Sequence, residues 1–275
     1  MDEAVNIPRA RALFGASPRP LGFVPTMGAL HEGHLELVRQ ARARCASVGV
    51  SLFVNPLQFG VNEDLAAYPR DRSGDLAKLE GAGVNVLFAP EAATMYGDGF
   101  TTYVDVGPLG TTFEGAFRPH HFRGVTTVIA KLLNIVRPDV LFLGQKDAQQ
   151  VVILRKMIGE LDFPVEVVVV PTVRESDGLA MSSRNRYLDS ALREAAPTLH
   201  RALQAMREAL GSGSNREDAI AAGAAQLAPV AKVDYLDVVD ARSFEPIERL
   251  RPPAIIVGAA RFGTTRLIDN LWIES

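Results

Sequence analysis

The sequence predicts an α/β protein, with a doubly wound parallel sheet followed by a smaller α+β domain. Segments with helical periodicity alternate with short apolar runs over residues 1–172, as expected when helices connect parallel strands. The apolar runs are continuous rather than alternating, which is typical of strands covered by helices on both faces. The first domain is therefore predicted to be Rossmann-like. From residue 173 the pattern changes, and residues 173–275 are predicted to form the second domain.

The first predicted strand is the run LGFV at 21–24, which Pro25 closes. A helix is predicted over 34–45, because apolar residues recur there at helical spacing. The remaining elements of this domain are predicted as a strand at 49–55, a helix end and a strand within 76–90, a helix at 124–138, a strand at 139–144, a helix at 147–161 and a strand at 164–171.

The second domain is predicted to begin after a hinge near 171–176. One long amphipathic helix is expected over 192–210, followed by a GSGSN break. Ser214 or Asn215 is expected to cap the next helix, at 216–227. Three strands of a small antiparallel sheet are then predicted, at 233–240, 254–260 and 264–273.

Composition narrows the protein class. A net charge of -3 gives no global basic excess, so no nucleic-acid partner is expected. The single cysteine, Cys45, excludes an intrachain disulfide and is expected to be buried or half-buried. The N-terminus lacks the apolar core of a signal peptide, and no apolar run is long enough to span a bilayer. A soluble cytoplasmic protein without a membrane partner is expected.

The segment PTMGALHEGH, residues 25–34, follows the first predicted strand and opens a helix. Its two histidines are three residues apart, whereas a catalytic zinc helix uses HExxH to place two imidazoles on one face. A metal site is therefore disfavoured. Backbone N–H groups at a helix start attract anions, and Gly28 and Gly33 would let a nucleotide approach closely. A phosphate site is favoured over a simple capping loop.

Three further polar segments follow predicted strands, where ligands bind in such sheets. GQKDAQQ, 144–150, offers a lysine and a helix-capping aspartate. MSSRN, 181–185, offers two hydroxyls and an arginine that suit a phosphate chain. Asn55 and Gln58 offer amides that suit a hydroxyl-bearing substrate. Taken singly, each segment is also compatible with an ordinary surface loop, which is the commoner case for a lone lysine or glutamine.

The carboxylates Asp64, Asp71 and Asp75 could each contact a Mg²⁺ that accompanies a nucleotide, or could be solvated loop acids. Tyr96 and Tyr103 lie in a Gly-rich region that is read as a flap. The segment HHFRG, 120–124, is expected to open a helix.

Together these segments resemble one family. PTMGALHEGH, NPLQF, YPRD, KLLNIVRPDVLFLGQKDAQQ and PTVRESDGLAMSSRNRYL occur in that order, as in the pantothenate synthetases (pantoate–β-alanine ligases) of the HxGH nucleotidyltransferase superfamily. The resemblance is dense over residues 20–190. It implies that ATP, with Mg²⁺, activates pantoate as pantoyl-adenylate with release of pyrophosphate. β-Alanine then displaces AMP to give pantothenate, and a homodimer is also implied.

The resemblance also implies roles for individual residues. The catalytic set comprises His31, His34, Asn55, Lys146, Ser182, Ser183 and Arg184. The ATP-binding set comprises Pro25, Met27, Gly28, Gly33, Gly144, Asp147, Val173 and Met181. Pantoate is expected at Gln58, Gln150 and Tyr68, and a metal at Asp75. Residues 1–172 would bind nucleotide and pantoate, and residues 173–275 would act as a lid.

Two positions depart from the family pattern: residue 145 is Gln where glutamate is common, and residue 74 is Gly where many members carry an acid. The second departure weakens the metal assignment at Asp75. Three alternatives remain open at this point. They are a nucleotidyltransferase that stops after nucleotide transfer, a class I aminoacyl-tRNA synthetase fragment or RNA-binding module, and a non-catalytic nucleotide-binding scaffold.

Overall fold

The computed structural model describes residues 1–60, 65–66 and 68–274, which form two compact units. Unit 1 comprises Met1–Gly144 and Ile153–Val170, and unit 2 comprises Gln145–Val152 and Pro171–Ser275. The chain therefore passes into unit 2 briefly after residue 144, returns, and leaves unit 1 for good after residue 170. The short excursion carries Lys146, Asp147 and Gln150.

Unit 1 is built on a six-stranded sheet in the order β1-β4-β3-β2-β5-β6, with every neighbouring pair parallel. The parallel sheet predicted from the continuous apolar runs is confirmed. Its strands are β1 (Asp2–Ala4), β2 (Leu21–Thr26), β3 (Ser47–Leu52), β4 (Val86–Phe88), β5 (Val140–Gly144) and β6 (Glu166–Val170). Successive strands are added in opposite directions on either side of β2 and β5, so the switch point where such sheets bind ligands lies between these strands.

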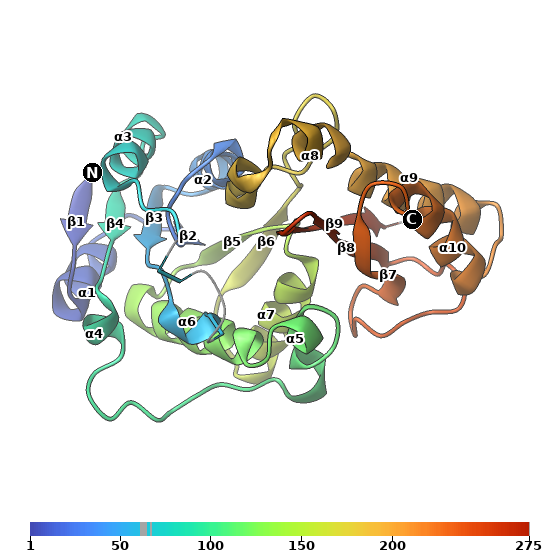
Figure 1. Ribbon diagram of the computed structural model, residues 1–275. Helices are drawn as coiled ribbons and strands as arrows, with labels where there is room; N and C mark the ends of the chain where they lie inside the picture. Colours follow the sequence, from blue (N-terminus) through green and yellow to red (C-terminus); the bar gives the residue numbers. More distant parts are fainter. Residues whose placement is uncertain (61–64, 67, 275) are drawn as a thin grey trace. The chain divides into compact units, whose positions relative to one another are not determined.

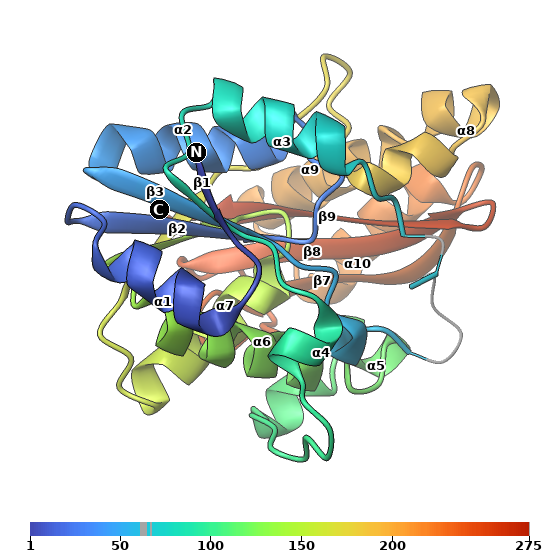
Figure 2. The ribbon, with the colours of Figure 1, turned by 90° about the vertical axis from the view of Figure 1, so that its left-hand side faces the viewer.

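Helices cover both faces of this sheet, with α2 and α3 on one face and α1 and α6 on the other (Figure 2). The longer helices are α1 (Ile7–Gly15), α2 (Glu32–Arg44), α3 (Arg72–Gly81), α6 (His121–Val136) and α7 (Ala148–Glu160). Short helical turns are η1 (Pro56–Gln58), α4 (Ala92–Met95), η2 (Gly107–Gly110) and α5 (Glu114–Phe117). The prediction that HHFRG opens a helix is confirmed, because α6 begins at His121.

Unit 2 contains a three-stranded antiparallel sheet, β7 (Lys232–Asp240), β8 (Ala254–Phe262) and β9 (Thr265–Ile273). The helices α9 (Thr198–Gly211) and α10 (Arg216–Leu227) pack together against it (Figure 1). Its core joins the two layers through side chains such as Leu203, Met206 and Ile256, which are fully buried. The smaller α+β domain predicted after residue 172 is therefore present.

The prediction of one continuous helix over 192–210 is wrong. The structure has α8 (Ser190–Ala195) and then α9, with Pro197 at the start of α9. Proline has no N–H, and its ring clashes with the carbonyl four residues earlier. It is therefore tolerated at the start of a helix but breaks a helix in its interior. Of the two predicted caps of α10, Asn215 is the one observed: its side chain accepts a hydrogen bond from the Asp218 N–H at 2.9 Å.

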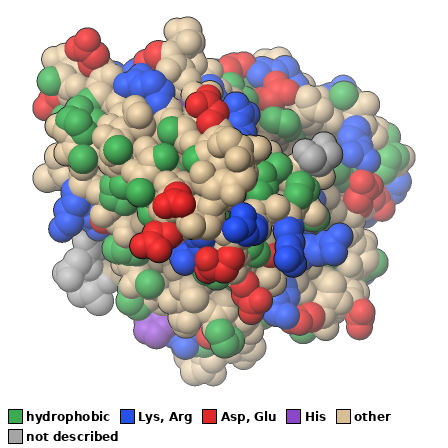
Figure 3. Space-filling view, turned by 90° about the vertical axis from the view of Figure 1, so that its right-hand side faces the viewer, with side chains coloured by type: hydrophobic (Ala, Val, Ile, Leu, Met, Phe, Trp, Pro, Cys, Tyr) green, Lys and Arg blue, Asp and Glu red, His purple; other side chains and the backbone are tan. Residues whose placement is uncertain are grey.

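Cys45 is a free thiol and is buried, as expected. Among the described helices, none combines the length and the apolar composition needed to cross a bilayer. On the face shown in Figure 3, Lys and Arg side chains are intermixed with Asp and Glu.

Candidate active site

The loop between β2 and α2 leads into the HEGH segment, residues 31–34, and two side chains of α3 bind its backbone. Gly28 has a φ of +86° and Ala29 a φ of +52°, so the chain turns through two successive left-handed residues. The Ala29 and Leu30 N–H groups donate to the two carboxylate oxygens of Asp75, at 2.8 and 2.7 Å. Lys78 Nζ donates to the Leu30 carbonyl at 2.8 Å. Two side chains of α3 thus fix the backbone just before His31.

His31 and His34 cap α2 reciprocally. The Nδ1 atom of His31 accepts from the Gly33 N–H at 3.2 Å, and Nδ1 of His34 accepts from the His31 N–H at 3.3 Å. Their ring centroids are 4.1 Å apart. Because a neutral imidazole that accepts at Nδ1 carries its proton at Nε2, these contacts make both Nε2 atoms hydrogen-bond donors. The helix N-terminus and two imidazole N–H donors therefore share one site, a suitable chemistry for an anion.

Asn55 is buried and its amide is fully used within unit 1. Its Oδ1 accepts from the Tyr96 hydroxyl at 2.7 Å and from the Leu57 N–H at 3.3 Å, and its Nδ2 donates to Gln58 Oε1 and to the Gly124 carbonyl, both at 3.1 Å. Burial raises the pKa of the Tyr96 hydroxyl well above its usual value, so the phenol stays protonated and keeps donating.

This chain of hydrogen bonds orients Gln58. Since Asn55 donates to Oε1 of Gln58, the Gln58 amide must present its Nε2 donors in the other direction. There Nε2 lies 3.1 Å from the sulfur of Met27. Gln58 is therefore prepared to donate to an acceptor oxygen of a substrate. The sequence singled out Gln58 and Asn55 but did not predict that Tyr96 orders them.

The segment that carries Asn55 and Gln58 lies directly on α6. A Cβ atom at Gly124 would approach the Leu57 carbonyl oxygen to 2.3 Å, so only glycine permits this contact. His121 Nδ1 also lies 2.9 Å from the Gln58 carbonyl oxygen. No sequence spacing could have paired these residues, because more than sixty positions separate them.

In unit 2, Lys146 follows β5 and is half-buried, with 20% of its side chain exposed. Its Nζ lies 3.3 Å from Asp147 Oδ1. Gln150 lies in the first turn of α7 and is half-buried. The segment therefore presents a partly exposed cation at the end of a parallel strand.

The MSSR segment, residues 181–184, leads into the short helical turn η3 (Ser183–Tyr187). Ser182 caps this turn, and its Oγ accepts from the Arg184 N–H at 3.3 Å. The Met181 N–H donates to the Val173 carbonyl at 3.0 Å, which brings two predicted adenosine contacts together. Two hydroxyls and a guanidinium thus lie at the start of one short turn, an arrangement that suits phosphate binding.

The other predicted positions are found as follows. Pro25 is half-buried near the end of β2, Gly33 lies in the first turn of α2, and Tyr68 is buried with its ring against Phe59. A Cβ atom at Gly144, the last residue of β5, would meet no atom within 4 Å.

The candidate metal residues have other contacts or cannot be placed. Asp71 caps α3, accepting from the Gly74 N–H at 3.0 Å, whereas Asp64 lies outside the described residues. Both oxygens of Asp75 already accept backbone hydrogen bonds. Within the described part of the chain, no group of three or more His, Cys, Asp or Glu residues is arranged to hold a metal. A preformed protein cage for Mg²⁺ is therefore not found there.

Comparison with known proteins decides the family. The model of the family described as pantoate-beta-alanine ligase matches residues 5–272. The chain belongs to the pantoate–β-alanine ligase family. The resemblance drawn from the HEGH and MSSR motifs is thus confirmed, and so are the ligase class and the reaction that the family name states.

Relatives of this ligase family match over nearly their whole length. The pantothenate synthetase of Heliobacterium modesticaldum is 54% identical over 259 residues, covering 93% of this chain and 92% of the relative. That of Roseiflexus castenholzii is 50% identical over 268 residues, covering 96% of each chain.

Two solved structures of the family extend the comparison. Pantothenate synthetase from Thermus thermophilus has a TM-score of 0.95 and 49% identity, with both chains fully covered. The pantoate–β-alanine ligase from Francisella tularensis, complexed with β-γ ATP and β-alanine, has a TM-score of 0.82 and 33% identity, covering 99% of this chain and 97% of that one. The Rossmann-like fold with a small second α+β domain is confirmed by these likenesses.

Proposed function

We propose that the chain condenses pantoate with β-alanine in two steps at the residues described above. The pantoate carboxylate attacks the α-phosphorus of ATP, forming pantoyl-adenylate and releasing pyrophosphate. The amine of β-alanine then attacks the acyl carbon, loses a proton and displaces AMP. The adenylate is needed because a free carboxylate has no good leaving group. The observation that carries the proposal is the reciprocal capping of His31 and His34, which makes both imidazoles Nε2–H donors at a helix N-terminus.

Each segment has a proposed task in adenylate formation. His31 and His34 donate to phosphate oxygens as negative charge grows on them. Lys146 supplies a positive charge for the α- and β-phosphates, and Ser182, Ser183 and Arg184 bind the departing pyrophosphate. Gln58, held as a donor by Asn55, binds an oxygen of pantoate together with Gln150, and Tyr68 borders that substrate.

The adenosine part of ATP is proposed to lie against the remaining predicted residues. Asp147 suits a ribose hydroxyl, because a carboxylate accepts hydrogen bonds from it. The other positions lie at strand ends or in the adjoining loops, namely Pro25, Met27, Gly28, Gly33, Gly144, Val173 and Met181. The lid role of residues 173–275 stays a prediction.

Mg²⁺ is proposed to arrive with ATP, held mainly by phosphate oxygens and water, as this ion commonly is. This suits a chain whose Asp75 oxygens already bind the loop backbone. A cytoplasmic homodimer, also expected from the sequence, stays a prediction that size measurement in solution and cell fractionation would test.

The decisive experiment measures products with and without each substrate. Incubation with ATP, Mg²⁺, pantoate and β-alanine should give AMP, pyrophosphate and pantothenate in equal amounts. A simple nucleotidyltransferase would release pyrophosphate without pantoate, and that result would overturn the proposal. Tight tRNA binding at physiological salt would instead favour the synthetase-fragment alternative. Unchanged activity in both His34→Ala and Lys146→Ala would place the site elsewhere.

A further inference from the structure

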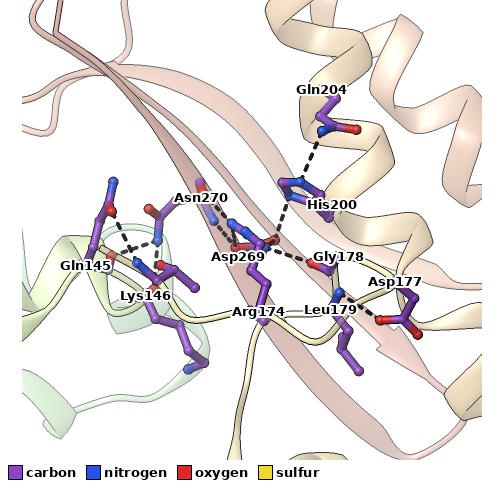
Figure 4. A network of polar contacts seen from close by, with 12 residues as sticks. Gln145, Lys146, Arg174, Asp177, Gly178, Leu179, His200, Gln204, Asp269 and Asn270 are labelled. Atoms are coloured by element: carbon purple, nitrogen blue, oxygen red, sulfur yellow. Dashed lines mark hydrogen bonds and ion pairs between the residues drawn. The ribbon is translucent and has the colours of Figure 1, made fainter. Parts of the chain in front are cut away.

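Two adjacent buried residues of β9, Asp269 and Asn270, hold the two loops of unit 2 that carry the proposed phosphate contacts (Figure 4). Their exposed fractions are 4% and 3%. Successive side chains of a strand point to opposite faces, so neighbouring positions can contact different segments. Neither residue belongs to any of the motifs that identify the family in the sequence.

Asn270 holds the segment that carries Lys146. Its Nδ2 donates to the Gln145 carbonyl at 3.0 Å and to the Lys146 carbonyl at 2.7 Å. Two carbonyl acceptors require the amide NH₂ and not the amide oxygen. The buried Oδ1 accepts no hydrogen bond among the described residues. The contribution of this side chain therefore lies in its two donors, which fix the backbone on both sides of the Lys146 Cα. The Lys146 side chain extends away from β9 (Figure 4).

Asp269 holds the segment that leads into the MSSR turn. Arg174 donates to both carboxylate oxygens of Asp269, at 2.7 and 2.9 Å, and to the Gly178 carbonyl at 3.1 Å. His200 Nδ1 lies 3.4 Å from the same carboxylate. Burial would raise the pKa of Asp269, but hydrogen bonds from His200 and Arg174 outweigh it and lower that pKa, so the group is charged.

The Arg174–Asp269 pair closes a narrow turn. Arg174 and Ala180 form an isolated antiparallel bridge, and Ser182 follows two residues later. The two loops are also joined directly, because the Thr172 N–H donates to Gln145 Oε1 at 3.3 Å. Asp269 and Asn270 of β9 thus fix the segments that follow β5 and β6 relative to each other.

We propose that Asn270 is a positioning residue for adenylate formation, which fixes Lys146 relative to the Ser182–Arg184 turn. The inference rests on the proposed function, since it assigns these groups to ATP phosphates. Its physical basis is that a charge misplaced by about 1 Å can reduce a rate about a hundredfold. Lys146 has a long side chain and cannot hold its own backbone in place.

The first test is Asn270→Ala, which removes both donors. We expect single-turnover formation of adenylate to slow by about tenfold or more, with the KM for β-alanine unchanged. The matched control is Leu267→Ala, which alters another buried residue of β9 that packs in the core of unit 2. This control should lower the thermal midpoint of unfolding while leaving the single-turnover rate within about twofold of wild type. Equal slowing in both variants would overturn the proposal.

A double-mutant cycle separates positioning from a general structural effect. If Asn270 acts through Lys146, Asn270→Ala should slow the Lys146→Ala enzyme by no more than about twofold, because the positioned charge is already absent. If the two effects multiply, Asn270 does not act through Lys146 and the inference is wrong. Should Asn270→Ala fail to fold, Asn270→Ser enters the same cycle, since its hydroxyl keeps one donor.

Failure of the proposed function gives a different result. A wild-type chain that releases no pyrophosphate in response to pantoate would refute the ligase reaction before any variant is compared. A wild-type chain that forms the adenylate, together with multiplicative effects in the cycle, would refute only the role of Asn270.

Discussion

Asp75→Asn tests how the HEGH loop is held. The wild-type carboxylate is 3% exposed and accepts the Ala29 and Leu30 N–H groups, one on each oxygen. Asparagine has nearly the same shape but keeps only one acceptor oxygen. Its NH₂ group would face the second backbone N–H, donor against donor. The substitution therefore breaks one of the two hydrogen bonds to the loop backbone and leaves the other with a neutral acceptor.

The size of the effect follows from these contacts. A hydrogen bond to a charged group contributes about 1.5–3 kcal/mol, and a buried donor left unpaired costs about 1–3 kcal/mol. Allowing for relaxation of the loop, we expect the free energy of unfolding to fall by about 3 kcal/mol. The loop ends at His31, so adenylate formation should also slow, by about tenfold to a hundredfold.

Urea unfolding followed by circular dichroism measures the stability, and single-turnover pyrophosphate release measures the rate. The rate should stay low at every magnesium concentration, because the defect lies in the loop backbone. Glu80→Gln is the control, since it makes the same charge change at an exposed position of α3. If Asp75→Asn is as stable as wild type and excess Mg²⁺ restores its rate, Asp75 is a metal ligand and does not act by holding the loop backbone.

Three further predictions concern other parts of the site. Gly124→Ala should lower the free energy of unfolding by about 3 kcal/mol, because its Cβ would lie 2.3 Å from the Leu57 carbonyl oxygen. The control Gly159→Ala, where a Cβ meets nothing within 4 Å, should raise the free energy of unfolding by about 0.5–1 kcal/mol. Equal effects of the two substitutions in urea unfolding would contradict this. Tyr96→Phe should lose less stability than wild type above about pH 10. Burial raises the folded-state pKa of this phenol. The contribution of the phenol to stability is therefore complete below the unfolded-state pKa and declines as pH rises toward the folded-state pKa. Parallel stability curves of the two proteins from about pH 8 to about pH 12, on either side of the unfolded-state pKa of about 10, would contradict this prediction. His34→Ala and Lys146→Ala should each slow single-turnover adenylate formation by about a hundredfold or more, and rates within a few-fold of wild type would refute their roles.

Sequence reasoning recovered the parallel sheet because its buried strands are continuous apolar runs. It missed β1, since a strand of three residues is too short to show periodicity, and it did not predict α1. It joined α8 to α9 because the Ala and Leu pattern runs on through Pro197. In that case a local steric rule outweighed the hydrophobic pattern.

The candidate site divides in the same way. Motif residues such as His34 and Lys146 could be selected because they occur in short, ordered segments of distinctive composition. The residues that orient them could not. Tyr96 reaches Asn55 across 41 positions, and Asn270 reaches Lys146 across 124. Such pairs exist only after folding, and they carry no local signature.

The transfer of oxygen from pantoate to AMP tests the central claim most directly. Pantoate labelled with ¹⁸O in its carboxylate is incubated with ATP, Mg²⁺ and β-alanine, and the products are analysed by mass spectrometry. Attack of the carboxylate on the α-phosphorus predicts one labelled oxygen in each AMP formed. Label in inorganic phosphate with formation of ADP would show an acyl phosphate instead, and would contradict the adenylate mechanism.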